Sequence, residues 1–157
     1  NLNFDVLAHE LGHALLYSII GTPEDDHAST AFFAFHEAAS DMVAIISVLH
    51  FNSVLDHLLM QTHGNLYAQN ELNRIGEESS TRQIRMASND LKMSQVPALN
   101  TPLTDLSNKQ IHDMSLPLTG ALFDLLVEVF QQNLVDDGLI DISLDQHSRG
   151  LNQESLD

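Results

Sequence analysis

The sequence contains no cysteine, which excludes disulfide bonds and thiolate chemistry and leaves the redox compartment open. Basic residues are scarce too: 6 lysines and arginines stand against 22 aspartates and glutamates, so the formal net charge is −16. A chain this acidic is repelled by nucleic acid and by anionic membrane surfaces, and we expect it to bind neither. We find no apolar run of transmembrane length and no charged-then-apolar leader, so we expect no insertion into a membrane.

What the sequence does contain is enough apolar material for a core. Hydrophobic residues make up 43% of its 157 residues, which argues against disorder, and the length suits one domain over residues 1–157. The first predicted helix runs from Phe4 to Ile19, with Asn3 as its cap and Gly21 as its stop. Because its apolar residues surround most of the axis, we expect this helix to be buried.

Further helical patterns make the predicted fold class mainly α. Two helices are expected between about residues 31 and 60, broken near the stretch HFNS. Residues 61–110 are richer in Asn, Ser, Thr and Gln, and we predict a long irregular connection with a short helix around TRQIRMAS. Ser115 is predicted to cap a strong helix with Pro117 in its first turn, continuing through Phe130. We predict no strong strand, and a short element with a fraying end after Asn133.

The stretch HELGH places two histidines, His9 and His13, four residues apart within the first predicted helix. Residues at this spacing lie on one helix face, about 6 Å apart along the axis, so both imidazoles can reach one zinc ion. Glu10 lies about 100° around the helix, beside the metal without blocking it. Since a catalytic zinc takes three protein ligands and keeps one open position, a third ligand is needed.

The best candidate for that third ligand is Glu37, in the stretch FHEAASDM. Asp41 follows four residues later on the same helix face, where it could accept the free ring N–H of a ligand histidine and fix its tautomer. Spacing alone leaves an alternative open, because two carboxylates four residues apart also form an ordinary polar stripe on a helix surface.

Four ordered blocks of this sequence resemble the gluzincin metallopeptidases, and in particular the thermolysin-like neutral proteases. HELGH and HEAASD resemble the two zinc-ligand motifs of that family, and they are followed by IGEESSTRQIRMASNDLKM and IHDMSLPLTGALFDLL. The resemblance spans residues 3–132 and implies a zincin-like helical subdomain with one zinc held by His9, His13 and Glu37. It favours the ligand role of Glu37 over the polar stripe.

The resemblance also implies an activity, zinc-dependent endopeptidase action on peptides or proteins. In it Glu10 is the general base, His112 donates to the developing oxyanion, and Arg85 contacts the substrate carbonyl. Family members have a β-rich half upstream that supplies the substrate-binding edge strand, so other domains of a longer chain are expected partners. Because the family is largely secreted, it suggests a secreted or periplasmic location.

Several positions depart from the family pattern. The connection after the first helix has no tyrosine to serve as a second oxyanion donor; His27 is the nearest substitute. Before the ligand glutamate the family has asparagine, whereas this chain has His36, which could still hydrogen-bond His13. Ser107 stands where the family has a carboxylate that orients the oxyanion histidine, so the support of His112 is open.

The calcium site of the family is also altered. Asp5 and Glu77 match two of its acidic ligands, but the other matching positions are Val48, Leu72 and Arg74. Calcium needs six to eight oxygen ligands, so we expect no calcium at this double site and an ion pair from Arg74 to Asp5 or Glu77 instead.

Two other functions remain open from the sequence. One is a catalytically silent, zinc-stabilised binding domain that has kept its ligands and lost turnover. The other is an acidic helical interaction module in which the zinc motif is a coincidence. The second predicts no zinc at all, and the first predicts zinc without hydrolysis.

Overall fold

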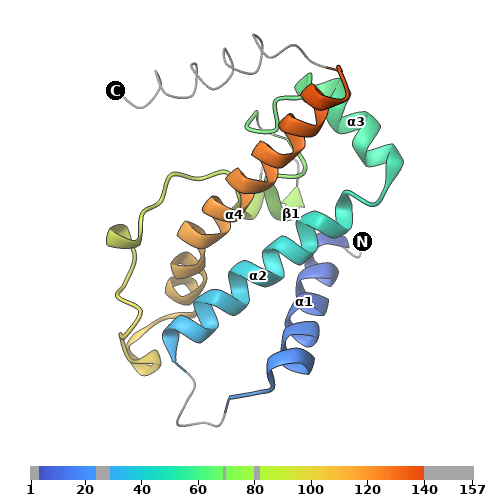
Figure 1. Ribbon diagram of the computed structural model, residues 1–157. Coiled ribbons are helices and arrows are strands. Elements are labelled where there is room, and N and C mark those ends of the chain that lie inside the picture. The colour runs from blue at the N-terminus through green and yellow to red at the C-terminus, as the bar shows by residue number, and fades with distance from the viewer. Residues whose placement is uncertain (1–3, 24–28, 69, 80–81, 140–157) are drawn as a thin grey trace.

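The computed structural model describes residues 4–23, 29–68, 70–79 and 82–139, with the backbone alone at 76–79 and 82–84. In this part of the chain the fold is mainly α, as predicted (Figure 1). Its helices and strands are α1 (Phe4–Ile20), α2 (Thr30–Val48), α3 (Asn52–Thr62), β1 (Arg74–Ser79), β2 (Arg82–Met86) and α4 (Asn108–Asp136), with short 3₁₀ turns at Met93–Gln95 and Leu103–Asp105.

Helix α2 lies between α1 and α4 and contacts both (Figure 1). The approach of α1 to α2 is very close, because a Cβ added at Gly12 would lie only 2.8 Å from the Cα of Ser40. Residue 12 must therefore be glycine for the two backbones to meet in this way. The consequence is that the inner face of α1, with His9 and His13, is held directly against the middle of α2.

The ends of α1 and α2 follow from local sequence. Helix α1 ends one residue before Gly21, whose φ of +79° suits glycine, so the predicted stop is confirmed. Helix α2 begins at Thr30 because the Ser29 side chain caps it, accepting a hydrogen bond from the N–H of Phe32 at 3.1 Å. The predicted break near HFNS is also confirmed, since α2 ends at Val48 and α3 starts at Asn52.

The apolar core joins α2, α3 and α4 to the segment that leads into the strands. Phe123 and Val127 of α4 are fully buried at its centre. Around them pack side chains from every other part of this group, namely Ile45, Leu58, Leu66, Leu72, Ile75 and Ala87. Since Ile75 and Ala87 flank the two strands, this core also anchors the base of the hairpin.

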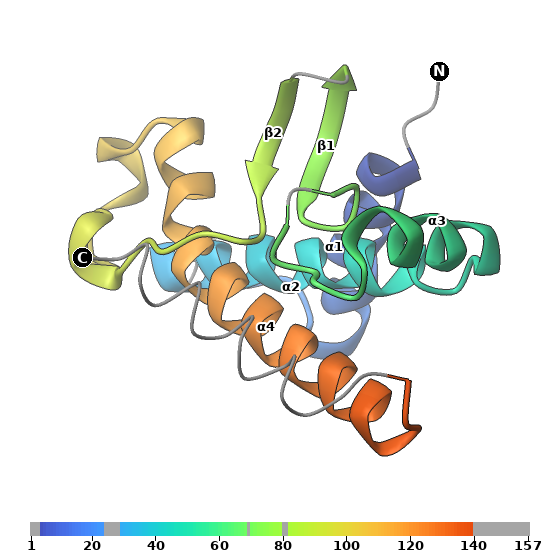
Figure 2. The ribbon, with the colours of Figure 1, turned by 90° about the horizontal axis from the view of Figure 1, so that it is seen from above.

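Strands β1 and β2 form an antiparallel hairpin that projects away from the helices (Figure 2). The prediction of a short helix around TRQIRMAS, and of no strand, is therefore wrong. This segment pairs with RIGEES instead, and its ladder sets Arg85 opposite Ile75. Strand pairing with another segment outweighs weak local helical periodicity, and it directs Arg85 toward the helices.

Helix α4 begins earlier than predicted. Its cap is Ser107, which accepts from the N–H of Gln110, while the Gln110 side chain accepts from the N–H of Ser107. Ser115 is thus not a cap but a buried residue whose hydroxyl donates to the carbonyl of His112 at 2.7 Å. Pro117 lies inside the helix, and His112 is carried in its second turn.

The prediction that the first helix is buried is also wrong. In α1 the buried residues are Ala8, His9 and Gly12, all on the face against α2. Leu7 is 55% exposed and Ile19 is 77% exposed. Apolar residues all around a helix indicate what it is made of, but only one face of α1 has a packing partner among the described residues.

Helix α2 is long and apolar enough to cross a membrane by length and composition, in contrast to the expectation that no run reaches that length. The core helix of a globular protein passes the same test. Because α2 packs between α1 and α4 and carries Glu37 and Asp41 in its middle, we interpret it as such a core helix.

Candidate metal centre

The two histidines of HELGH lie on the face of α1 that packs against α2, with their rings directed toward each other. The Nε2 atoms of His9 and His13 are 3.0 Å apart. His9 is buried and His13 partly so. The helical spacing therefore brings two imidazole nitrogens to one point between the helices, as predicted.

Glu37 of α2 completes a triangle with these nitrogens. Its Oε2 lies 3.4 Å from Nε2 of His9, and its Oε1 lies 3.4 Å from Nε2 of His13. Ligands of a tetrahedral zinc ion with bonds of 2.0–2.1 Å are separated by about 3.4 Å. The three side chains thus offer ligand atoms at the spacing that such an ion requires.

The Oε2 atom of Glu37 is buried and has no hydrogen-bond partner among the described residues. Nitrogens of His9, Arg85 and His112 surround it, each at 3.4 Å. Burial acts to raise the pKa of Glu37, but its contacts with His112, His13 and His9 lower that pKa far below the usual range. A buried, ionised oxygen without a hydrogen bond fits a cation held between α1 and α2.

Asp41 supports His9 from behind and is fully buried. Its Oδ1 lies 2.9 Å from Nδ1 of His9, so the ring donates this proton and keeps Nε2 turned toward Glu37. Burial acts to lower the pKa of His9, but its hydrogen bonds to Asp41 and Glu37 raise that pKa to about 9. Before any metal binds, His9 is therefore protonated at neutral pH.

Arg85 of β2 holds Asp41 through two hydrogen bonds. Its Nη2 donates to Oδ1 at 2.6 Å and its Nε donates to Oδ2 at 3.1 Å. The Arg85 side chain is only 9% exposed. The residue predicted to contact substrate thus lies within the site and faces its two carboxylates, Asp41 and Glu37.

His13 is supported by neutral groups. Its Nδ1 lies 2.9 Å from Nδ1 of His36 and 3.1 Å from the hydroxyl of Ser40, both on α2. His36 is fully buried, with the rings of Tyr17 and Phe32 against it at centroid distances of 4.3 and 4.8 Å. Burial lowers the pKa of His36, and the neighbouring His13 lowers it further.

The two predicted catalytic side chains lie on opposite helices. Glu10 is exposed on α1, one residue from His9. His112 reaches in from α4, with 41% of its side chain exposed and its Nε2 close to Oε2 of Glu37. The structure thus brings His112 to the ligand triangle from the side opposite α1, as the oxyanion prediction requires.

Two supporting residues were missed from the sequence. Ser40 lies one turn after Glu37, and Thr119 lies two turns after His112, with its hydroxyl 3.4 Å from Oδ2 of Asp41. Spacings of three and seven residues from a predicted site residue were the available signal. Nothing local in the sequence shows which of the many residues at such spacings face the site.

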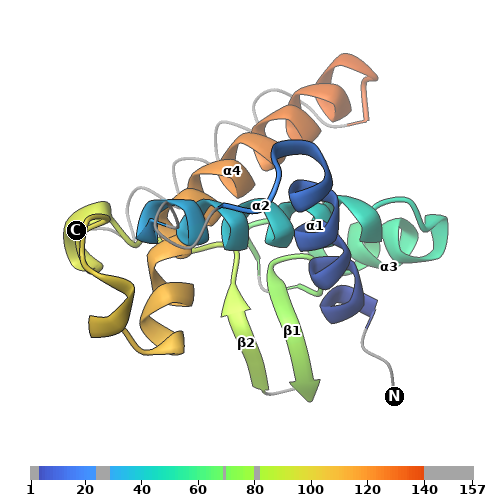
Figure 3. The same ribbon diagram turned by 90° about the horizontal axis from the view of Figure 1, so that it is seen from below.

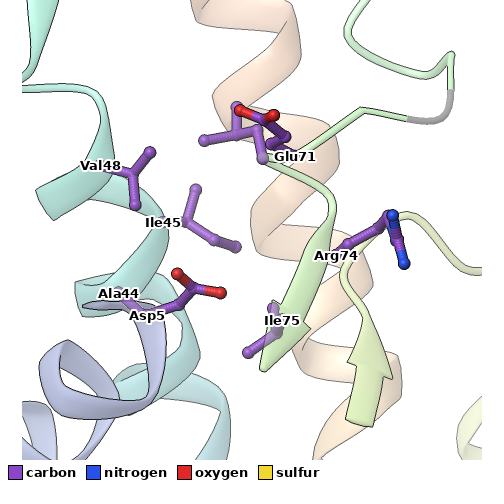
Figure 4. Close-up of a pocket in the computed structure, with 8 residues that line it drawn as sticks. Asp5, Ala44, Ile45, Val48, Glu71, Arg74 and Ile75 are labelled. Atoms are coloured by element: carbon purple, nitrogen blue, oxygen red, sulfur yellow. The ribbon is translucent and has the colours of Figure 1, made fainter. Parts of the chain in front are cut away.

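At the region matched to the calcium site, Asp5 and Glu71 lie at the edge of a small cavity of about 10 Å³, otherwise lined by apolar residues of α2 and β1 (Figure 4). The Arg74 side chain points away from Asp5, so the expected ion pair between these two is not formed (Figure 4). The Glu77 side chain and His27 lie outside the described residues. The cavity has room for about one water molecule and offers few oxygens to a calcium ion.

Comparison with known proteins found no matching family model, no matching curated protein and no matching solved structure. The likeness to the thermolysin-like proteases therefore stays with the motifs, and the site must be argued from its own geometry.

Proposed function

We propose that this protein binds one zinc ion through His9, His13 and Glu37 and hydrolyses peptide bonds in peptides or proteins. The observation that carries the proposal is the ligand triangle, in which two histidine nitrogens and a buried, ionised carboxylate meet at 3.0–3.4 Å. Two histidines and one glutamate are a donor set used for catalytic zinc, since they leave a fourth position open.

The groups behind the triangle favour a catalytic metal over a chance cluster. Asp41 holds the ring of His9 in the tautomer that leaves Nε2 bare, and Arg85 in turn holds Asp41. Such supporting hydrogen bonds are typical of functional metal sites, and losing one usually weakens metal binding by about 10–100-fold. An exposed polar stripe would not bury Asp41 completely.

When bound, zinc would supply a Lewis acid that polarises the scissile carbonyl and lowers the pKa of a water molecule. Glu10, next to His9 and open to solvent, is placed to take a proton from water and to return it to the leaving amine. His112 is placed to donate from α4 to the oxygen that gains negative charge. Arg85 would mainly hold Asp41 and Glu37 in position.

A second candidate is a zinc-binding domain without turnover, and one observation favours it. Arg85 is expected to contact substrate, yet two of its nitrogens are engaged with Asp41 and the third faces Glu37. Little of its hydrogen-bonding capacity is left for a peptide. This candidate has the same ligands and differs only in activity.

The first experiment is the zinc content of the purified protein, compared with Glu37→Ala and with Glu71→Ala, the same change at an exposed glutamate. We expect about one zinc per chain in the parent and in Glu71→Ala, and strongly reduced zinc in Glu37→Ala. Absence of zinc from the parent after reconstitution at neutral pH would refute the metal centre.

Hydrolysis is tested next, with zinc-loaded protein and a mixture of short peptides. Glu10→Gln is expected to keep zinc and lose nearly all turnover, because the amide cannot accept the proton. A zinc-loaded parent that cleaves none of the peptides would favour the silent binding domain.

A further inference from the structure

The contact between His13 and His36 joins two nitrogens of the same kind. The two Nδ1 atoms are 2.9 Å apart, and both rings lie between α1 and α2. At this distance one nitrogen must carry a proton and the other must be bare, because two N–H groups or two lone pairs would repel. The contact therefore requires His13 and His36 to adopt a matched pair of tautomers.

The direction of this hydrogen bond decides whether His13 can bind a metal. If His36 donates, the neutral His13 carries its proton on Nε2, the nitrogen that faces Glu37, and that nitrogen cannot be a ligand. If His13 donates, its proton lies on Nδ1 and Nε2 is bare. A bare Nε2 is also what His9 requires, since its own Nε2 lies only 3.0 Å away and is protonated before metal binds.

The far end of the row fixes the same direction. Asp41 has only acceptor oxygens, so Nδ1 of His9 must donate to it. From Asp41 the protons then run through His9 and His13 to His36, each group donating one way. His36 ends this row of hydrogen bonds as an acceptor and keeps its own proton on Nε2, an atom that is buried without a hydrogen-bond partner among the described residues.

We propose that His36 is a positioning residue for the metal centre: its bare Nδ1 accepts the Nδ1 proton of His13 and so keeps Nε2 of His13 free and aimed at the metal position. The proposal rests on the proposed metal centre. Ser40 lies slightly farther from His13, at 3.1 Å, and a hydroxyl oxygen is a weaker acceptor than an imidazole nitrogen, so Ser40 is the lesser partner. The rings of Tyr17 and Phe32 hold His36 in this orientation.

The direct test is the tautomeric state of each ring, from two-bond ¹⁵N–¹H NMR correlations of the metal-free protein and again with zinc. We expect His36 to be neutral with its proton on Nε2, and His13 to carry its proton on Nδ1, in both samples. A proton on Nδ1 of His36 in the metal-free protein would overturn the proposal. This measurement does not depend on whether zinc binds.

The second test is zinc affinity in three variants. His36→Phe keeps an aromatic ring but removes the acceptor, and we expect about 10–100-fold weaker binding. His36→Asn restores an acceptor oxygen, and we expect it to bind zinc within a few-fold of the parent. His50→Phe makes the same change at an exposed histidine of the segment between α2 and α3, and should bind as the parent does.

The outcomes separate the two proposals. Parent affinity in His36→Phe would overturn the role of His36 and leave the metal centre standing, with Ser40 as the acceptor. Equal loss in His36→Phe and His36→Asn would also overturn it, because packing and not hydrogen bonding would then explain the effect. The visible spectrum of cobalt-substituted protein provides a further readout, since a change in His13 orientation alters the coordination geometry and a merely structural change elsewhere does not.

Discussion

His9 and His13 lie one turn apart on α1, yet their supports differ completely. Behind His9 are the buried charges of Asp41 and Arg85, whereas His13 meets neutral His36 and Ser40. Charged partners hold a ring strongly but leave a buried charge behind when one of them is lost. Neutral partners cost less to disturb. The two sides of the site are therefore expected to respond very differently to mutation.

The largest effect is expected from Asp41→Ala. This change leaves the guanidinium of Arg85 and the ring of His9 buried without their main acceptor, and removing one partner of a buried ion pair costs about 3–5 kcal/mol. The free energy of unfolding, measured with urea, should fall by that amount, and zinc should bind more weakly. The matched control is Asp113→Ala, which removes a surface ion pair with Lys109 and should cost less than about 1 kcal/mol.

The charged side should also make the metal-free protein sensitive to alkaline pH. The pKa of His9 is raised from 6.5 to about 9 in the folded state, so its protonated form stabilises the fold. This stabilisation is fully present below pH 6.5 and is lost as the pH rises through 9, for a total of about 3 kcal/mol. Urea unfolding between pH 6 and 10, after removal of metal by a chelator, measures the slope. His9→Gln cannot titrate, and a slope that persists in it would assign the effect to another group.

Gly12→Ala should disturb both sides at once. The new methyl group would meet the Cα of Ser40 at 2.8 Å and push α1 away from α2, which we expect to cost about 1–3 kcal/mol. Zinc affinity should fall with stability, because the ligands are divided between these helices. Ser18→Ala, at an exposed position of the same helix, should change stability by less than about 0.5 kcal/mol. Unchanged thermal unfolding of Gly12→Ala would contradict the close helix approach.

The smallest effect is expected from Ser40→Ala on the neutral side. It removes one hydroxyl near Nδ1 of His13 while His36 keeps its hydrogen bond. Stability should fall by about 1 kcal/mol, and zinc affinity by only a few-fold. Zinc titration of the two variants side by side would test the comparison directly. A loss as large as that of Asp41→Ala would mean that the two supports are equally strong.

Local sequence was sufficient where one helix contains the whole signal. The spacing of His9 and His13 and the stop at Gly21 predicted α1 and its metal face, and the four-residue spacing of Glu37 and Asp41 predicted their common face on α2. The identity of the zinc site and its chemistry remain predictions, since they rest on a resemblance and on geometry.

The wrong predictions have physical reasons. The hairpin depends on pairing between RIGEES and RQIRM, and the buried face of α1 depends on which neighbour covers it, so neither is encoded within one segment. The start of α4 was readable from Ser107 and Gln110, which form a capping box. Pro117 is favoured near helix starts and drew the predicted start ten residues too far along the chain.

Arg85 has a consequence for how the molecule folds. Its bond to His9 joins residues 76 positions apart, and its bond to Asp41 joins residues 44 apart, whereas the contact between His13 and Ser40 joins residues only 27 apart. Loop closure costs more entropy for longer loops, and contacts distant in sequence form late. The α1–α2 pair can therefore assemble all three ligands early in folding, before the hairpin brings Arg85 beneath Asp41 (Figure 3). An ion captured at that stage would act as a nucleus around which the rest of the chain condenses.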